Sequence, residues 1–453
     1  MFTASSLKIV SHNELEYHNI LLSRRLAKQW KLRKGDTITI FFGLTSVLVN
    51  ITSIDEKENT LFASPSLLSY LTLYNVQQIR YRYLSSQQQL FLGPIIAIVT
   101  DIQSLDPLSF GSISEFCEEV AVLSEQSSCF FYVTSLSLWD KEHIVGYYFQ
   151  EGQWRKEKMP FPSIVYNRIH SRKVEQSNIF QKWIDVLQDY GIPHFNNRFL
   201  NKWEVYETLL TFPHLKPFLP TSYLFTDCKV LEQVISEFPC IFVKPIYGSK
   251  GKHIFKITVS PEKFLVDYTT FQRDISKEYA TLPELFAMLK QHIGRRPYIV
   301  QQGLSLYTYF DRSVDFRILC QKKDHYTWNV TSVVARVSNR GEFVSNIDRG
   351  GEMYKMDEIL QWGFETNDIR HVKKLIMELS LEIAKYLSQA YDGLYAEFGM
   401  DIALDQLGNP WLLEVNIKPS KNHLPATSSA RPSARALLLY CTIAAKQPIR
   451  RME

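Results

Sequence analysis

The 453-residue sequence lacks several patterns that mark common classes of protein. Its eleven histidines include no His-x-x-x-His pair, so the spacing of a helical zinc site is missing. There is also no Gly-x-Ser-x-Gly turn, the usual sign of an α/β-hydrolase nucleophile. The net charge of +4 is too small for a chain of this length to indicate a nucleic-acid-binding protein.

Paired cysteines and long apolar runs are missing as well. The six cysteines are scattered without a Cys-x-x-Cys pair, which is typical of reduced, mostly buried thiols in a cytoplasmic protein. The longest apolar run near a terminus, residues 436–445, covers ten residues, whereas a membrane helix needs about 20. We therefore expect no membrane span, and a C-terminal helix that packs on the core. No secretory signal is visible at the N-terminus, so we expect a cytoplasmic location.

The most informative stretch that is present runs from residue 400 to 416. Two apolar, strand-like runs flank the turn-rich segment 405–410, which predicts a β-hairpin. Glu414 and Asn416 are two residues apart on one strand and so point to the same face. If the hairpin pairs as expected, Asp401 on the other strand comes to lie beside them.

Two carboxylates and an amide oxygen on one surface suit Mg²⁺, which prefers hard oxygen ligands and usually shares them with substrate phosphates. We therefore predict that Asp401, Glu414 and Asn416 bind metal. A hairpin with a polar, solvated face would explain an isolated Glu-x-Asn equally simply. The metal interpretation depends on a second element upstream.

That element spans residues 240–257, in which an apolar run carrying Lys244 leads through a glycine-containing turn into a second apolar run. Gly248 and Gly251 are separated by two residues and a strand follows, so this is not a Walker A loop. Glycines still let backbone N–H groups approach phosphate oxygens, and the Lys244 ammonium could meet one phosphate. An ordinary surface hairpin with basic residues is the alternative for this element alone.

Together the two elements resemble the ATP-grasp superfamily, which combines a lysine-bearing strand, a glycine loop, a hinge and a late Asp…Glu-x-Asn hairpin. The resemblance implies ATP and two Mg²⁺ as cofactors. It implies that nucleotide is bound by Lys202, Lys244, Gly248, Ser249, Gly251 and the hinge residues Gln301, Gln302 and Leu304. It also implies catalytic roles for Lys244, Arg317 and Arg336, and that Asn346, Arg349, Gly350 and Gly351 line phosphate and substrate.

The segments 301–304, 315–317, 345–351 and 414–420 narrow the resemblance to the YheC/YheD family, and in particular to its longer members. That family consists of ATP-grasp proteins of endospore-forming bacteria that are named as spore-coat-associated. Membership would imply an association with the spore coat but no established reaction.

A charge tally is consistent with a nucleotide site. Two Mg²⁺ with Lys202 and Lys244 would balance ATP, which carries about four negative charges, together with Asp401 and Glu414. We therefore expect the two carboxylates to be unpaired, and to bind Mg²⁺ weakly, when no nucleotide is bound.

The coarse pattern predicts an α/β protein of three domains: a small β-rich module at 1–84, an α/β domain at 90–195 and an ATP-grasp core of two α+β subdomains at 196–445. Residues 85–89 are predicted to be a linker. Within the second domain we predict strands at 94–99, 129–133 and 164–168 and helices near 112–124 and 181–190.

The resemblance implies an ATP-dependent ligase that joins a carboxylate to an amine or similar nucleophile through an acylphosphate. A spore-coat binding or structural protein with a vestigial ATP site, and a small-molecule kinase on the same fold, remain alternatives. The acceptors are unknown, and spore-envelope components are candidates. We expect the loop 419–424, with Arg431 and Arg435, to line the acceptor side and to favour an anionic substrate.

Overall fold

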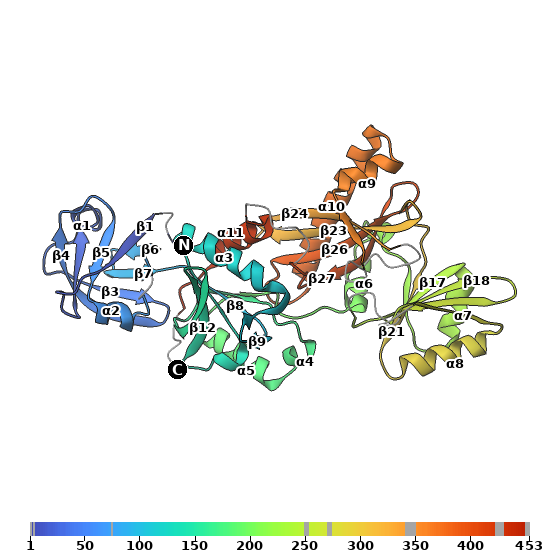
Figure 1. Ribbon diagram of the computed structural model, residues 1–453, viewed down its shortest axis with the longest axis horizontal. Coiled ribbons are helices and arrows are strands. Elements are labelled where there is room, and N and C mark those ends of the chain that lie inside the picture. The colour runs from blue at the N-terminus through green and yellow to red at the C-terminus, as the bar shows by residue number, and fades with distance from the viewer. Residues whose placement is uncertain are drawn as a thin grey trace.

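A barrel and three six-stranded sheets follow one another along the long axis of the molecule (Figure 1). The computed structural model describes all residues except 1, 3–4, 74–75, 249–252, 270–273, 340–349, 422–429 and 449–453, and it leaves the side chains of 269, 274, 275 and 367 undescribed. Helices accompany each of the three sheets, so the predicted α/β class is confirmed.

The N-terminal module is a closed barrel with the strand order β1-β5-β2-β4-β3-β7-β6. In β3, every second residue (Ile38, Ile40 and Phe42) is buried, as the alternating apolar pattern requires. Residues 85–88 form the turn between β6 and β7, so the predicted linker is wrong and the barrel continues past residue 84 to Leu92. Its elements are β1 (Ser6–Ser11), β2 (Asn19–Ser23), α1 (Arg24–Trp30), β3 (Thr37–Phe42), β4 (Thr45–Ile54), β5 (Thr60–Ala63), α2 (Pro65–Tyr70), β6 (Gln78–Leu84) and β7 (Gln89–Leu92).

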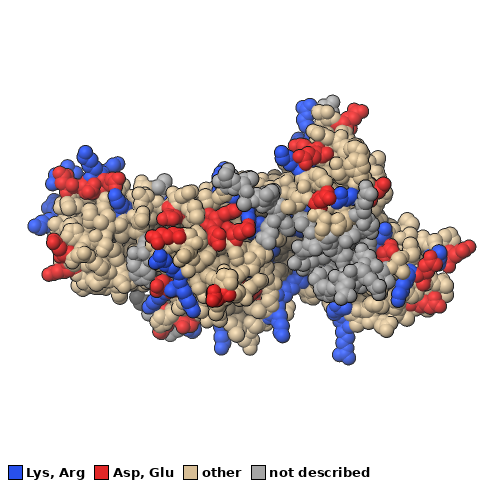
Figure 2. Space-filling model, viewed as in Figure 1, with Lys and Arg blue, Asp and Glu red and all other residues tan. Residues whose placement is uncertain are grey.

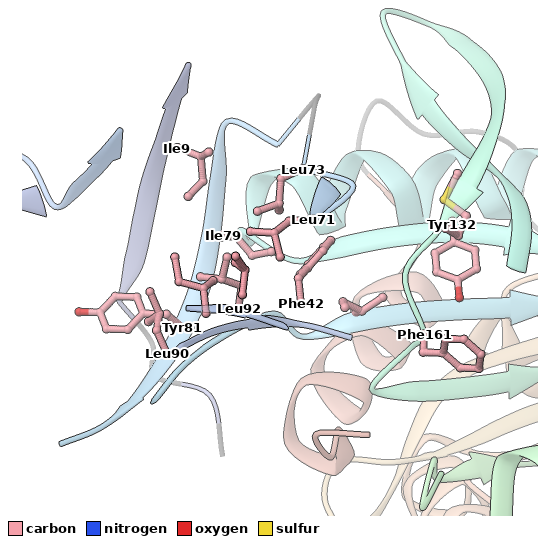
Figure 3. Close-up of a cluster of buried hydrophobic side chains, with 14 of the residues drawn as sticks. Ile9, Phe42, Leu71, Leu73, Ile79, Tyr81, Leu90, Leu92, Tyr132 and Phe161 are labelled. Carbon is pink, nitrogen blue, oxygen red and sulfur yellow. The ribbon is translucent and has the colours of Figure 1, made fainter. Parts of the chain in front are cut away.

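The barrel and the following domain share one hydrophobic core (Figure 3). Phe42 of the barrel contacts Phe130 of the next domain edge to face, with ring centroids 5.4 Å apart. Gly43 lies against the backbone of Phe161, where an added Cβ would come within 2.8 Å. This packing fixes the barrel against its neighbour rather than leaving it on a tether.

The second domain is a sheet with the order β13-β12-β11-β8-β14-β15. Its central strand β8 is buried along its whole length and pairs in parallel with both β11 and β14. The predicted strands and helices are confirmed to within a few residues. The elements are β8 (Ile95–Val99), β9 (Ser104–Leu105), β10 (Leu108–Ser109), α3 (Ser114–Gln126), β11 (Phe130–Thr134), β12 (Ile144–Gln150), β13 (Gln153–Met159), β14 (Ile164–Asn167), α4 (Arg172–Glu175), α5 (Asn178–Asp189) and β15 (His194–Phe195).

The third sheet lies at the far end from the barrel and has the order β16-β21-β17-β18-β19-β20 (Figure 1). The strands β17 and β18 pair antiparallel, which confirms the predicted strand–loop–strand of the glycine element. The elements are α6 (Lys202–Leu210), β16 (Ser222–Leu224), α7 (Cys228–Glu237), β17 (Cys240–Pro245), β18 (Phe255–Val259), β19 (Phe264–Thr269), β20 (Asp274–Tyr279), α8 (Leu282–Ile293) and β21 (Tyr298–Gln302).

The fourth sheet has the order β25-β24-β23-β26-β27, and β26 and β27 form the predicted hairpin. The long helix α10 shares a hydrophobic core with β23, β24 and β26. The C-terminal helix α11 packs against α3, which confirms its predicted packing on the core. The elements are β22 (Thr308–Tyr309), β23 (Arg312–Lys322), β24 (Trp328–Val337), β25 (Glu352–Tyr354), α9 (Met356–Gly363), α10 (Thr366–Ala390), β26 (Glu397–Leu404), β27 (Pro410–Asn416) and α11 (Pro432–Ala444).

The mixed surface charges and the free cysteines are what the composition predicts. On the face shown in Figure 2, Lys and Arg side chains are interspersed with Asp and Glu. All six cysteines are free thiols, and four of them are buried. None of the helices in the described part of the chain is long and apolar enough to cross a membrane.

Candidate nucleotide and metal site

The hairpin of β26 and β27 brings the three predicted metal ligands together. Asp401 lies directly opposite Glu414, and Gly399 lies opposite Asn416. The register shifts between Asp401 and Ile402, immediately after the aspartate. The predicted neighbourhood of the two carboxylates is therefore confirmed.

Asp401 is bound by two arginines, one on the neighbouring strand β23 and one on β24, the strand beyond it. Arg317 lies opposite Asp401 on β23 and donates to both carboxylate oxygens through Nε and Nη2, the Nη2–Oδ2 distance being 3.1 Å. Arg336 on β24 donates from Nη2 to Oδ2 at 2.9 Å and from Nε to Asp315 at 2.5 Å. Burial would raise the pKa of Asp401, but the two arginines outweigh it and lower the pKa below its usual value.

Glu414 is paired as well. Lys202 is the first residue of α6, which begins at the Asn201 capping box. Its Nζ lies 3.2 Å from Glu414 Oε1 and donates to the carbonyl oxygen of Gly248 at 2.9 Å. The expectation that Asp401 and Glu414 are unpaired without nucleotide is therefore wrong. Each carboxylate is neutralised by cations that lie far away in sequence and that sequence spacing could not place.

Lys244 lies on β17 and donates from Nζ to Gln301 Oε1 at 2.7 Å. Gln301 in turn donates from Nε2 to Ser222 Oγ at 2.9 Å, so a short polar chain crosses from β17 through β21 to β16. Burial, assisted by the charge of Lys202, lowers the pKa of Lys244 to about 8. Ser222 was not predicted as a site residue, because a lone serine after Pro220-Thr221 carries no motif.

A single cleft contains Lys202, Ser222, Lys244, Gln301 and Glu414. It lies between the sheet of β17 and β21 and the hairpin strand β27. The remaining lining is apolar and comes from Val205, Tyr206, Leu209, Leu219, Pro220, Ile299, Leu412, Leu413 and Val415. The two lysines and the Glu414 carboxylate, far apart in sequence, therefore face one space with an apolar wall. Its cavity volume is about 40 Å³, so the walls would have to move apart to admit a nucleotide.

The other predicted nucleotide residues are placed less fully. Gln302 ends β21 and its Oε1 accepts from the N–H of Thr221 at 3.2 Å, while Leu304 follows that strand. The carbonyl oxygen of Gly248 accepts a hydrogen bond from Lys202 Nζ. Ser249, Gly251, Asn346 and Arg349 lie outside the described residues, and so do residues 422–429 beyond the start of the predicted acceptor loop.

Arg431, predicted to line the acceptor side, is held by carboxylates. Its Nη2 lies 2.6 Å from Glu115 and its Nε 3.2 Å from Glu119, both on α3. Its Nη1 donates to the carbonyl oxygen of Lys421. These contacts join α11 to the second domain.

The donor set fits Mg²⁺. In the part of the chain that the structure describes, no three His, Cys, Asp or Glu side chains are grouped as metal ligands. The predicted trio contains two carboxylates and an amide, a set of hard oxygens that leaves room for phosphate oxygens. Such a site would hold Mg²⁺ through Asp401, Glu414 and Asn416 once their cationic partners moved to phosphate.

Comparisons with known proteins show the family to which the chain belongs. Residues 191–443 match the family described as YheC/D like ATP-grasp. The endospore coat-associated protein YheD of Bacillus subtilis (strain 168) is 26% identical over 397 residues, covering 86% of each chain. The endospore coat-associated protein YheC of the same strain is 20% identical over 66% of this chain and 80% of that protein. Among solved structures, the VanG D-Ala:D-Ser ligase from Enterococcus faecalis is 12% identical with a TM-score of 0.47, over 78% of this chain and all of that one.

Proposed function

Because the chain belongs to the YheC/D like ATP-grasp family, we propose that it binds Mg·ATP in the cleft between β17 and β27 and acts as an ATP-dependent ligase. The reaction would join a carboxylate to an amine or similar nucleophile. A carboxylate oxygen attacks the γ-phosphorus of ATP, giving an acylphosphate and ADP. The nucleophile then attacks the acyl carbon, and inorganic phosphate leaves.

The observation that carries the proposal is the convergence of Lys202, Lys244 and Glu414 on one cleft, with Asp401 opposite Glu414. Catalysis of phosphoryl transfer rests mainly on positioning and charge stabilisation. Lys202 and Lys244 would hold the phosphates. Mg²⁺ bound by Asp401, Glu414 and Asn416 would neutralise charge that develops on the phosphate oxygens.

Arg317 and Arg336 would stabilise the transferring phosphoryl group. Both guanidinium groups already lie beside Asp401, and Asp315 also accepts a hydrogen bond from Nε of Arg336. If Mg²⁺ took Asp401, the buried Arg336 would keep its contact with Asp315 through Nε and turn Nη2 to a phosphate oxygen.

The test is a screen for Mg²⁺-dependent ADP release by the purified protein, with extracts of sporulating cells divided into small-molecule fractions. We expect release with an active fraction, and its loss in Lys244→Met but not in Lys229→Met, a lysine on the exposed side of α7. ADP release together with inorganic phosphate and an amide product supports the ligase. A stable phosphorylated product would instead identify a kinase.

The names of the two relatives support a second part of the proposal, namely that this protein also associates with the spore coat. A fluorescent fusion expressed during sporulation in Bacillus subtilis is expected to collect at the forespore surface. Uniform fluorescence in the mother cell would contradict the association. No turnover and no calorimetric Mg·ATP binding, combined with forespore localisation, would favour a coat protein with a vestigial site.

A further inference from the structure

A second group of buried charges lies where the second domain meets the fourth sheet. Arg168 follows β14, and its side chain is 0% exposed. Its Nη1 lies 3.4 Å from the hydroxyl of Tyr166 and 3.7 Å from Oε1 of Glu397, at the start of β26. Both contacts are long for a buried guanidinium, and neither is the bidentate geometry that arginine prefers.

Glu397 is already occupied by other partners. Its Oε1 accepts from Tyr166 at 2.6 Å, and its Oε2 accepts from Gln321 at 2.8 Å and pairs with Lys421 Nζ. Two buried cations, Arg168 and Lys421, thus share one carboxylate. Buried charges are normally balanced, because an unpaired ion is costly to remove from water.

One edge of Arg168 has no partner. Its Nε and Nη2 are buried without a hydrogen-bond partner among the described residues. Arg317 uses these same two atoms to hold both oxygens of Asp401. The free edge of Arg168 therefore has the geometry to hold another carboxylate.

The acidic residues nearby have other partners, and Asp101, which follows β8, accepts from the backbone N–H of His170. Glu115 and Glu119 pair with Arg431, and Glu175 pairs with Lys418. Residues 422–429, which follow Lys421 in the sequence, include no Asp or Glu. None of these carboxylates is hydrogen-bonded to Nε or Nη2 of Arg168.

The position of Arg168 in its sheet is also one where ligands bind. The chain leaves β8 to form β11 on one side and later forms β14 on the other side, both parallel to β8. In open α/β sheets, ligands bind outside the carboxyl ends of the strands at such a reversal. Arg168 is the first residue after β14 at this edge.

We propose that the free edge of Arg168 binds a carboxylate of the acceptor substrate, distinct from the carboxylate that receives the phosphoryl group. Glu397 and Asp401 lie on the same face of β26, four residues and therefore about 13 Å apart. The acceptor would be an extended molecule, such as a short peptide with an acidic end. Its role as acceptor rests on the proposed function, whereas the carboxylate site itself does not.

Acetate is the probe for this site. We expect 200 mM acetate, exchanged for chloride at constant ionic strength, to raise the midpoint of thermal unfolding of the full-length protein by about 2–4 °C. Lys244→Met, which alters the ATP cleft, should keep the whole shift. Arg168→Met should lose it, and Arg168→Lys should keep a smaller part because an ammonium cannot form the bidentate pair.

The same acetate shift in wild type, Arg168→Met and Arg168→Lys would overturn the proposal, as would no shift in wild type. If Arg168→Met does not fold, Arg168→Lys decides: a shift equal to that of wild type overturns the proposal, and a smaller one supports it. Saturation-transfer NMR of acetate bound to the wild type gives an independent readout. A shift that depends on Arg168 without any Mg·ATP turnover would retain the carboxylate site and reject only the ligase.

Discussion

The ammonium of Lys202 lies 3.2 Å from Oε1 of Glu414, with the two side chains 15% and 26% exposed. A residue proposed to bind phosphate thus neutralises one proposed to bind metal. Glu414 is therefore already neutralised before any ligand enters the cleft, whereas Lys244 is hydrogen-bonded to the neutral Gln301. Under the proposed function, binding of Mg·ATP would therefore exchange partners, with Glu414 passing to the metal and Lys202 to a phosphate.

Replacement of Lys202 by Met should change the two affinities in opposite directions. The variant loses a phosphate contact, so ATP binding should weaken about tenfold, or 1.4 kcal/mol. Glu414 is released at the same time, so Mg²⁺ binding without nucleotide should tighten. Calorimetric titrations of each ligand measure both effects, with Lys229→Met as the control. Weaker binding of both ligands would contradict the proposed exchange.

The Glu414→Gln variant should lose Mg·ATP turnover and keep its fold. The amide is nearly isosteric but carries no charge, so it is a poor ligand for a hard cation. ADP release reports the turnover, and circular dichroism with thermal unfolding reports the fold. Glu232→Gln on the exposed side of α7 is the matched control. Turnover like that of the wild type in Glu414→Gln would remove the metal assignment.

ATP affinity should depend on pH through Lys244. Because burial lowers the pKa of Lys244 to about 8, its charge is present at pH 7 and is largely lost by about pH 9.5. We expect ATP binding to weaken over that range in the wild type. Lys244→Arg should show a flatter profile, since a guanidinium remains charged. Equal pH profiles of the two proteins, measured by calorimetry, would rule out Lys244 as the titrating group.

Deprotonation of Lys244 should also raise the free energy of unfolding, although it lowers ATP affinity. Below about pH 8 the folded protein holds a buried ammonium, which is a cost. Between about pH 8 and 10.5 the folded state releases the proton while the unfolded chain retains it, so the contribution of Lys244 to the free energy of unfolding rises. Urea unfolding at pH 7 and 9.5 should show a larger gain for wild type than for Lys244→Met. A larger gain in the variant would contradict this sign.

Loss of the Asp401 charge should destabilise the fold. Asp401→Asn leaves Arg317 and Arg336 with less compensation, although Arg336 keeps Asp315. Removing one member of a buried ion pair costs on the order of 3 kcal/mol. Urea unfolding measures this loss, and Asp357→Asn is the control because its pair with Lys373 is largely exposed. A loss no larger than that of the control would show that the arginines do not depend on Asp401.

Sequence periodicity and turn composition were sufficient to predict the β26–β27 hairpin, the Lys244 strand and the α/β alternation of the second domain. These features depend on short-range chemistry, namely the two-residue period of strands and the turn residues between them. The hairpin also placed Asp401 beside Glu414, because strand register is local once the turn is known. The barrel boundary was missed, since the turn at 85–88 is composed like a linker, whereas β7 pairs both with β6 across that turn and with the distant β3.

Composition and motif therefore determined which residues carry charge and which elements present them, whereas tertiary structure decided how those charges are paired. Lys202 and Glu414 are 212 residues apart, and Tyr166 and Glu397 are 231 apart. Ion pairing depends on distance and burial in space, and neither can be read from a linear pattern. For the same reason the unmatched edge of Arg168 became visible only when the sheet of the second domain was packed against the fourth sheet.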